Sequence, residues 1–139
     1  MKTISTEIAS VKKNYKLVEN LLREANKEFC CPEERFRNLL IAVSELVINA
    51  IVHGNKEKAD KKVKVKVEYD DKLMRIKILD EGNGFKFGDE ADPTIPENIL
   101  KVSGRGIFIV KSLIDEVDYK NTGKGSEFIL TIKKEKKTG

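Results

Sequence analysis

Residues 62–69, KVKVKVEY, alternate strictly between charged and apolar side chains. Successive side chains of a β-strand point to opposite faces, so this pattern predicts a strand with one buried face and one wet face. Asp70-Asp71-Lys72 then predicts a turn into a second strand, Leu73 to Leu79. A sheet built from such strands needs other elements to cover its apolar face.

Two amphipathic segments precede these strands and can supply that cover. Apolar residues spaced by three and four predict a helix from Thr6 to Phe29, and Lys2 to Ser5 predicts a short edge strand before it. A second helix is predicted to begin at Cys31-Pro32-Glu33-Glu34, because proline and acidic residues suit a helix N-terminus. It should run to about His53 and end at Gly54-Asn55.

The second half of the chain predicts a long loop, a third helix and a further hairpin. Two prolines argue against regular structure from Lys86 to Val102. SGRGIFIVKSLIDEV, residues 103–117, predicts a loop that enters a helix, and the turn GKGS separates strands at Val117 to Asn121 and Phe128 to Lys133. The predicted fold class is α+β: a two-layer α/β sandwich with helices on one face of a mostly antiparallel mixed sheet.

Length and charge narrow the classes of function. A chain of 139 residues favours one domain, 1–139. Its 27 basic and 23 acidic side chains give a net charge of +4, without a dense basic patch rich in aromatics, so we expect no direct nucleic-acid binding. Apolar runs are too short to cross a membrane, and MKTISTEIAS lacks a signal core. Neighbouring Cys30 and Cys31 suit a reducing cytoplasm, where we expect the protein.

The predicted second helix contains ELVINAIVHGN, in which Glu45, Asn49 and His53 interrupt an apolar run every four residues. Four residues advance about 400° around a helix, so the three polar side chains follow one face. This stripe either faces water or lines a polar cleft. In a cleft, Glu45 could act as a base and Asn49 could offer its carbonyl oxygen to Mg²⁺. For His53, a structural role such as capping the helix is favoured over a contact with phosphate.

The sequence contains two glycine-rich loops. One follows a predicted strand, and the other leads into a predicted helix. In DEGNGF, residues 80–85, the simplest interpretation is a turn, but alternate glycines also let a flat ligand approach the backbone. The Asp80 carboxylate beside them could accept a hydrogen bond from the exocyclic amine of adenine. In Ser103-Gly104-Arg105-Gly106, backbone N–H groups and the guanidinium suit an anion such as phosphate. The second loop is neither a Walker A loop nor a dinucleotide fingerprint.

Taken in order, four motifs resemble those of the GHKL ATP-binding superfamily. ELVINAIVHGN is similar to its N box, DEGNGF to its first glycine box, SGRGIFIV to its second, and GKGSEF to its last. The likeness covers nearly the whole chain. Within the superfamily the sequence most resembles bacterial anti-sigma factor serine/threonine-protein kinases, particularly over DPTIPENILKVSGRGIFIVKSLIDEV.

The resemblance implies the Bergerat α/β sandwich, with ATP and Mg²⁺ as cofactors. It implies that Glu45 is the general base for a protein serine, that Asn49 binds the Mg²⁺, and that residues 86–103 form the ATP lid. The positions that it implies for nucleotide binding are Asn49, His53, Asp80, Gly82, Gly84, Gly104, Arg105, Gly106 and Ser126. Ser126 stands where many relatives have threonine, a change that keeps the hydroxyl.

The implied function is that of an ATP-dependent serine protein kinase acting as an anti-sigma regulatory factor. Such a protein phosphorylates an anti-sigma factor antagonist and sequesters a sigma factor. The alternative is a non-catalytic ATP-gated protein-binding module of a partner-switching pathway. The presence of Glu45 favours the kinase, because binding alone needs no base. Relatives commonly pair through their N-terminal strand and helix, so the resemblance also implies a homodimer.

Overall fold

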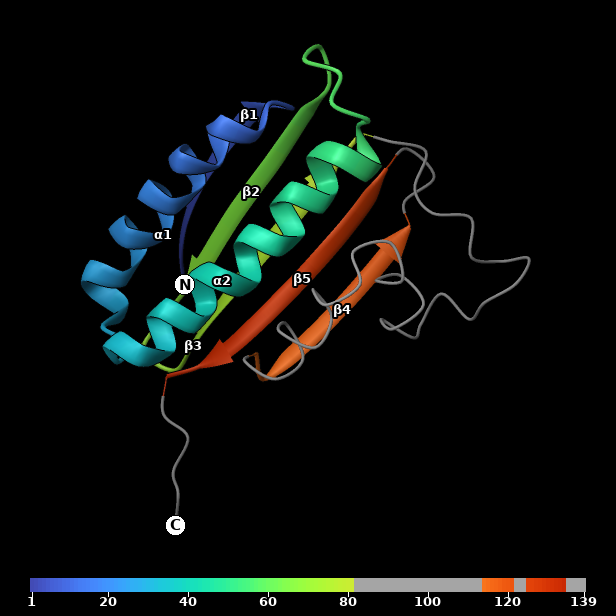
Figure 1. The fold of residues 1–139 in the computed structure, drawn as a ribbon. Helices are drawn as coiled ribbons and strands as arrows, with labels where there is room; N and C mark the ends of the chain where they lie inside the picture. The colour runs from blue at the N-terminus through green and yellow to red at the C-terminus, as the bar shows by residue number, and fades with distance from the viewer. Residues whose placement is uncertain (82–113, 122–124, 135–139) are drawn as a thin grey trace.

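The computed structural model describes residues 1–81, 114–121 and 125–134, apart from the side chains of His53 and Asn121 (Figure 1). Its helices and strands are β1 (Lys2–Ala9), α1 (Tyr15–Phe29), α2 (Glu33–Asn49), β2 (Lys62–Tyr69), β3 (Leu73–Asp80), β4 (Glu116–Asn121) and β5 (Ser126–Lys133). A 3₁₀ turn, η1 (Lys12–Asn14), precedes α1, and a π-helical turn, η2 (Ala50–Gly54), extends α2. The third helix predicted within residues 103–117 falls largely outside the described residues.

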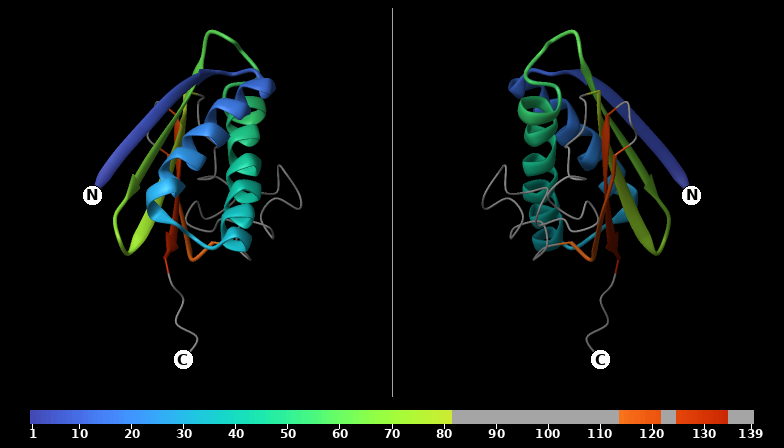
Figure 2. Two further views of the ribbon diagram at one scale, coloured as in Figure 1. Left: turned by 90° about the vertical axis from the view of Figure 1, so that its left-hand side faces the viewer. Right: turned by 90° about the vertical axis from the view of Figure 1, so that its right-hand side faces the viewer.

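The described strands form one sheet in the order β1-β2-β3-β5-β4, and every neighbouring pair in it is antiparallel. Helices α1 and α2 lie side by side on one face of this sheet, which both views at right angles to Figure 1 show (Figure 2). The predicted α+β sandwich is therefore confirmed. The parallel pairing implied by a mixed sheet does not occur among the strands that the structure describes.

The core lies between the helices and the sheet, where the alternation of the strands places it. On β2, the side chains of Val63, Val65 and Val67 are fully buried, while Lys64 and Lys66 between them are exposed. Burying one such aliphatic side chain contributes about 1.5–3 kcal/mol, so this layer makes a large favourable contribution to folding. The strand predicted at Lys62 to Tyr69 and its half-buried character are confirmed.

The prediction of a helix beginning at Thr6 is wrong. The edge strand does not stop at Ser5 but runs to Ala9, and α1 begins only at Tyr15. The stretch before Ala9 is rich in β-branched residues, which favour strands, and it pairs with β2 so that Ile8 lies opposite Val63. Ile8 is 2% exposed, so it belongs to the core as a strand residue rather than a helical one.

Helix α2 is anchored near its start and is extended at its end. Near its start, Arg35 Nη2 lies 3.0 Å from Asp115 Oδ2, which also accepts a 2.7 Å hydrogen bond from the backbone N–H of Lys133. At its end, η2 continues the helix to Gly54, as the sequence predicted. The start of α2 is therefore tied through Asp115 to the end of β5.

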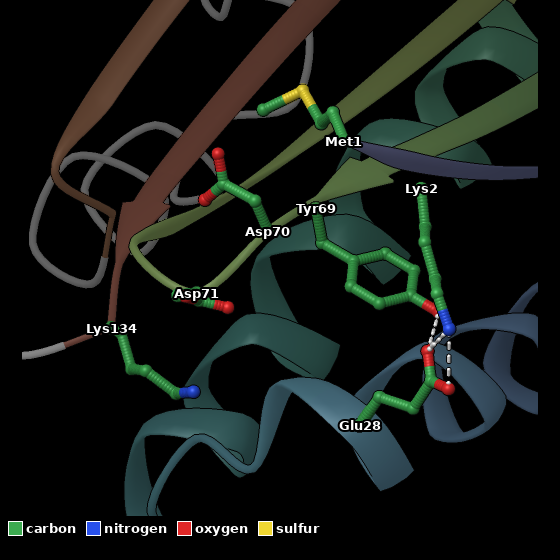
Figure 3. Close-up of a pocket in the computed structure, with 7 residues that line it drawn as sticks. All are labelled: Met1, Lys2, Glu28, Tyr69, Asp70, Asp71 and Lys134. Atoms are coloured by element: carbon green, nitrogen blue, oxygen red, sulfur yellow. Dashed lines mark hydrogen bonds and ion pairs between the residues drawn. The ribbon is translucent and has the colours of Figure 1, made fainter.

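A surface hollow of about 480 Å³ lies at the end of the sheet opposite Asp80 (Figure 3). At its edge, Glu28 accepts hydrogen bonds from Lys2 Nζ, at 2.7 and 2.9 Å, and from the Tyr69 hydroxyl, at 2.7 Å. The Lys2 ammonium and then the Tyr69 hydroxyl lower the pKa of Glu28, and the same hydrogen bond raises the pKa of Tyr69. This cluster ties the start of β1 to the ends of α1 and β2.

We expect the stabilising effect of Glu28 to disappear in acid. Because its folded-state pKa is lowered, the contribution is complete above the unfolded pKa of about 4.3 and is lost as the pH falls through the folded value. Glu28→Gln should therefore melt at a lower temperature than the wild type at pH 7, and the difference should shrink as the pH falls below about 4.3. Thermal melts across this range test it, with Glu24→Gln, an exposed partner of Lys27, as control. A difference independent of pH would contradict the assignment.

Candidate functional site

The polar stripe on α2 does not simply face water. Asn49 is only 7% exposed, and Glu45, one turn earlier, is half-buried. Among the described residues, no hydrogen bond or ion pair engages either side chain. The cleft interpretation is therefore favoured at Asn49, and Glu45 keeps its carboxylate available. The backbone of His53 lies in η2, but its side chain is outside the described residues.

The end of α2 meets the end of β3 at a close contact between Gly54 and Asp80. A Cβ atom added to Gly54 would lie 2.6 Å from Asp80 Cγ and nearer still to one of its carboxylate oxygens. Only a glycine can therefore stand beside the carboxylate in its present position. The sequence assigned Gly54 to the helix stop alone, and its role against Asp80 follows from the fold.

Ser126 lies directly across from Asp80, at the start of β5. Its backbone N–H donates a 3.2 Å hydrogen bond to Asp80 Oδ1, and its hydroxyl accepts a 2.9 Å hydrogen bond from the Tyr119 hydroxyl. Ser126 is 2% exposed. Sheet pairing thus brings together two residues predicted separately, Asp80 and Ser126, and adds Tyr119, which the sequence analysis missed. The sequence predicts the hairpin that carries Tyr119 and Ser126, but not the hydrogen bond between their hydroxyls.

Gly125 approaches the backbone of Asp80 rather than its side chain. A Cβ at Gly125 would lie 2.9 Å from the Asp80 carbonyl carbon, closer still to its oxygen, and 3.3 Å from Glu81 Cα. The chain at residues 80–81 is therefore packed between Gly125, just before β5, and Gly54 at the end of η2. Such contacts define both the direction of the carboxylate and the path of the chain beyond it.

Gly54→Ala should separate binding from folding. Gly54 lies in a helical turn that alanine can adopt, so the main conflict is with the movable Asp80 carboxylate. We expect a melting temperature close to that of the wild type and a loss of ATP affinity on the order of 10- to 100-fold, because the carboxylate must shift. Calorimetric titration with ATP and thermal melts measure the two effects.

Gly125→Ala is the matched comparison, because its methyl group would meet backbone instead of a side-chain end. It should lower the melting temperature clearly more than Gly54→Ala does. Equal ATP affinity in Gly54→Ala and the wild type would show that the carboxylate position does not matter for the nucleotide.

Several predicted site residues lie outside the described residues. They are the glycines and the arginine of the two loops, Gly82, Gly84, Gly104, Arg105 and Gly106, and the lid predicted at 86–103. The assignments to these residues remain predictions from the resemblance.

The donor set of the described residues fits a nucleotide better than a protein-caged metal. Asp80 offers a carboxylate, Ser126 a buried hydroxyl beside it, and Asn49 an amide oxygen farther along α2. Among the described residues no group of three or more His, Cys, Asp or Glu could hold a metal ion. Mg²⁺ commonly keeps several waters and binds through one or two protein oxygens plus phosphates, so a single Asn49 oxygen suits it.

At a rise of 1.5 Å per residue, Glu45 lies about 6 Å along α2 before Asn49, and the π-helical turn η2 separates Asn49 from Gly54. The Asp80 carboxylate, which lies against Gly54, and the Glu45 carboxylate are therefore set apart along the direction of the helix. A helix-covered antiparallel sheet, in which a buried helix carries a polar stripe and leads to an acidic strand end, is the arrangement of a GHKL-type ATP-binding domain.

The chain belongs to the histidine kinase-like ATPase domain family, whose sequence profile matches residues 8–132. An anti-sigma F factor of Bacillus velezensis is 40% identical over 79 residues, which make up 54% of this chain and 53% of that protein. A serine-protein kinase RsbW of Staphylococcus epidermidis is 37% identical over 103 residues, 68% of this chain and 65% of that protein. The matches thus span only 53% and 65% of the length of these relatives.

Solved structures agree on the fold. The RsbU and RsbW domains of a Mycobacterium tuberculosis protein superpose with a TM-score of 0.66 at 17% identity, over 95% of this chain and 32% of that one. The Acinetobacter baumannii histidine kinase AdeS gives 0.54 at 19% identity, over 98% of this chain and 70% of that one. Within the described part of this chain, the helices are too short or too polar to cross a membrane.

Proposed function

We propose that this chain is an ATP-dependent serine protein kinase that acts as an anti-sigma regulatory factor. It phosphorylates a serine of an anti-sigma factor antagonist and sequesters a sigma factor. Relatives named anti-sigma F factor and serine-protein kinase RsbW support this proposal. The observation that carries it is the placement of Glu45: a half-buried carboxylate, without a partner among the described residues, on the helix that ends against Asp80.

The adenine end of ATP would bind at the junction of α2, β3 and β5. Asp80 accepts a hydrogen bond from the exocyclic amine of adenine, and Gly54 leaves the space that its carboxylate needs. The Ser126 hydroxyl, held by Tyr119, contributes a second polar group at the same edge. Gly82 and Gly84 give the ring room, following the resemblance.

The phosphate end would lie toward the middle of α2. Asn49 would hold Mg²⁺ through its amide oxygen, and the metal would supply neutralisation of phosphate charge. Gly104, Arg105 and Gly106 bind phosphate oxygens, with the lid at 86–103 over them, and His53 is assigned to the same nucleotide site. These roles follow the motifs of the superfamily.

Glu45 would then act on the protein substrate. Its carboxylate accepts the proton of the serine hydroxyl while the serine oxygen forms a bond to the γ-phosphorus and ADP leaves. The chemistry depends chiefly on positioning and charge neutralisation, so a base that is held on a rigid helix is sufficient.

Further properties complete the proposal. The chain forms one domain, 1–139, works in the cytoplasm, and pairs as a homodimer, which light scattering at several protein concentrations tests. A molecular mass equal to that of one chain at every concentration would contradict the homodimer.

The function is tested by mixing the purified protein with Mg-ATP labelled at the γ-phosphate and an antagonist encoded by a neighbouring gene. We expect label on a serine of the antagonist. Tight ATP binding without transfer to any candidate antagonist would overturn the kinase and favour the ATP-gated binding module. Absence of ATP binding would overturn both.

A further inference from the structure

Asn55 is a fully buried polar residue that immediately follows Gly54 at the end of η2. It is 1% exposed, and its side-chain amide is used at both ends. Nδ2 donates hydrogen bonds to Ser10 Oγ, at 2.8 Å, and to the Lys62 carbonyl oxygen, at 2.9 Å. Oδ1 accepts a 2.8 Å hydrogen bond from the backbone N–H of Glu81. Both donor hydrogens and an acceptor of this amide are therefore engaged.

These hydrogen bonds join the end of η2 to the end of β1, the start of β2 and the end of β3. Ser10 follows β1 and donates in turn to the Lys61 carbonyl at 2.7 Å, Lys62 begins β2, and Glu81 follows β3. The Glu81 carboxylate also accepts a hydrogen bond from the Lys62 N–H. Asn55 thus locks the end of β3 to the body of the fold, beyond the last residue that sheet pairing holds.

The peptide that Asn55 holds is the one that links Asp80 to Glu81. Its N–H is bound by Asn55, and its carbonyl oxygen lies against Gly125. One side of the Asp80 carboxylate is packed on Gly54, the residue before Asn55. The backbone of Gly54 therefore packs against the side chain of Asp80, and the side chain of Asn55 binds the backbone of Glu81.

We propose that Asn55 is a positioning residue for base recognition: by fixing the Asp80–Glu81 peptide, it sets the direction in which Asp80 presents its carboxylate to the nucleotide. This inference rests on the proposed ATP site. Neither Asn55 nor Ser10 touches the nucleotide in it. If this peptide were free to rotate, the Asp80 carboxylate would adopt several orientations. A hydrogen bond depends on direction, so the bond to the base would be weaker.

The test compares ATP with ITP, which carries a carbonyl oxygen where ATP has the exocyclic amine. Contacts to ribose and phosphates are common to both, so the ratio of their dissociation constants reports the base contact alone. For Asn55→Ala we expect the ATP dissociation constant to rise about tenfold or more, and that of ITP to change about twofold or less. Calorimetric titration gives both values.

Ser10→Ala is the matched control, because it removes a buried partner of Asn55 without touching the Glu81 peptide. It should lower the melting temperature and leave the ATP/ITP ratio as in the wild type. If Asn55→Ala does not fold, Asn55→Ser replaces it, since its hydroxyl is too short to reach both Lys62 and Glu81, and the ratio of the ATP dissociation constant to that of ITP should again rise.

The outcomes separate two failures. A wild type that binds ATP and ITP equally overturns the adenine site itself, and with it the proposed function. A wild type that discriminates, with a folded Asn55 variant that keeps the same ratio, overturns the positioning role alone and leaves Asn55 a structural residue.

Discussion

Glu45→Gln should abolish phosphoryl transfer to serine while the affinity for ATP stays within about twofold of the wild type. Glutamine has the shape of glutamate but cannot accept a proton from a hydroxyl near neutral pH. General bases contribute typically about 10²- to 10⁴-fold to a rate, so transfer should fall by that order. The structure favours a clean result, because no described residue relies on Glu45 for a hydrogen bond or an ion pair.

The measurement pairs single-turnover transfer of labelled γ-phosphate with calorimetric titration of ATP. Glu34→Gln, which neutralises an exposed acid in the first turn of the same helix, is the control and should transfer at the wild-type rate. Transfer at an undiminished rate in Glu45→Gln would show that the assigned base is wrong. Parallel loss of ATP binding would instead place Glu45 in the nucleotide contact.

The sheet was largely predictable because its information is local. Alternation fixed β2 within residues 62–69, and turn residues fixed the start of β3 and the gap before β5. Each strand matched its predicted bounds within two residues, except β1. There the spacing of Ile8 and Val11 also fits a helix, and only pairing with β2 decides in favour of the strand. When a local pattern fits both the helical and the strand period, the sequence alone cannot decide between a helix and a strand.

Candidate site residues could be predicted where the type of side chain indicates its chemistry. They could not be predicted where the role of a residue depends on which partners the fold brings to it. Glu45, Asn49 and Asp80 stood out because acids and amides interrupt an apolar pattern or follow a strand end, whereas Ser126 was assigned only through the resemblance. Asn55 and Tyr119 carry equally specific contacts, but their partners lie 26 residues away at Glu81 and across a strand pair at Ser126. Such roles depend on which segments the fold brings together. The Gly54-Asn55 pattern predicts the end of a helix but not the partners of Asn55.

Asp80→Asn should weaken ATP binding about 100-fold with little loss of stability. Asparagine keeps an oxygen that can accept the 3.2 Å hydrogen bond from the Ser126 N–H, and it fits the space beside Gly54. The change removes the negative charge and can turn an NH₂ group toward the amine of adenine. A hydrogen bond to a charged group is worth about 1.5–3 kcal/mol, and the unpaired amine adds a further penalty, which together give this factor.

Nucleotide analogues make the prediction sharper. The side-chain amide that this substitution introduces can donate to the carbonyl oxygen of ITP, which the Asp80 carboxylate repels, so Asp80→Asn should lose affinity for ATP but not for ITP. Calorimetric titration with both nucleotides tests this, and Asp71→Asn, at the β2–β3 turn on the opposite end of the sheet, is the control. An unaltered ATP dissociation constant in a folded Asp80→Asn protein would remove Asp80 from the adenine site. Because Asn55→Ala leaves the carboxylate but frees its direction, that variant should weaken ATP without gaining ITP, whereas Asp80→Asn reverses the preference between the bases.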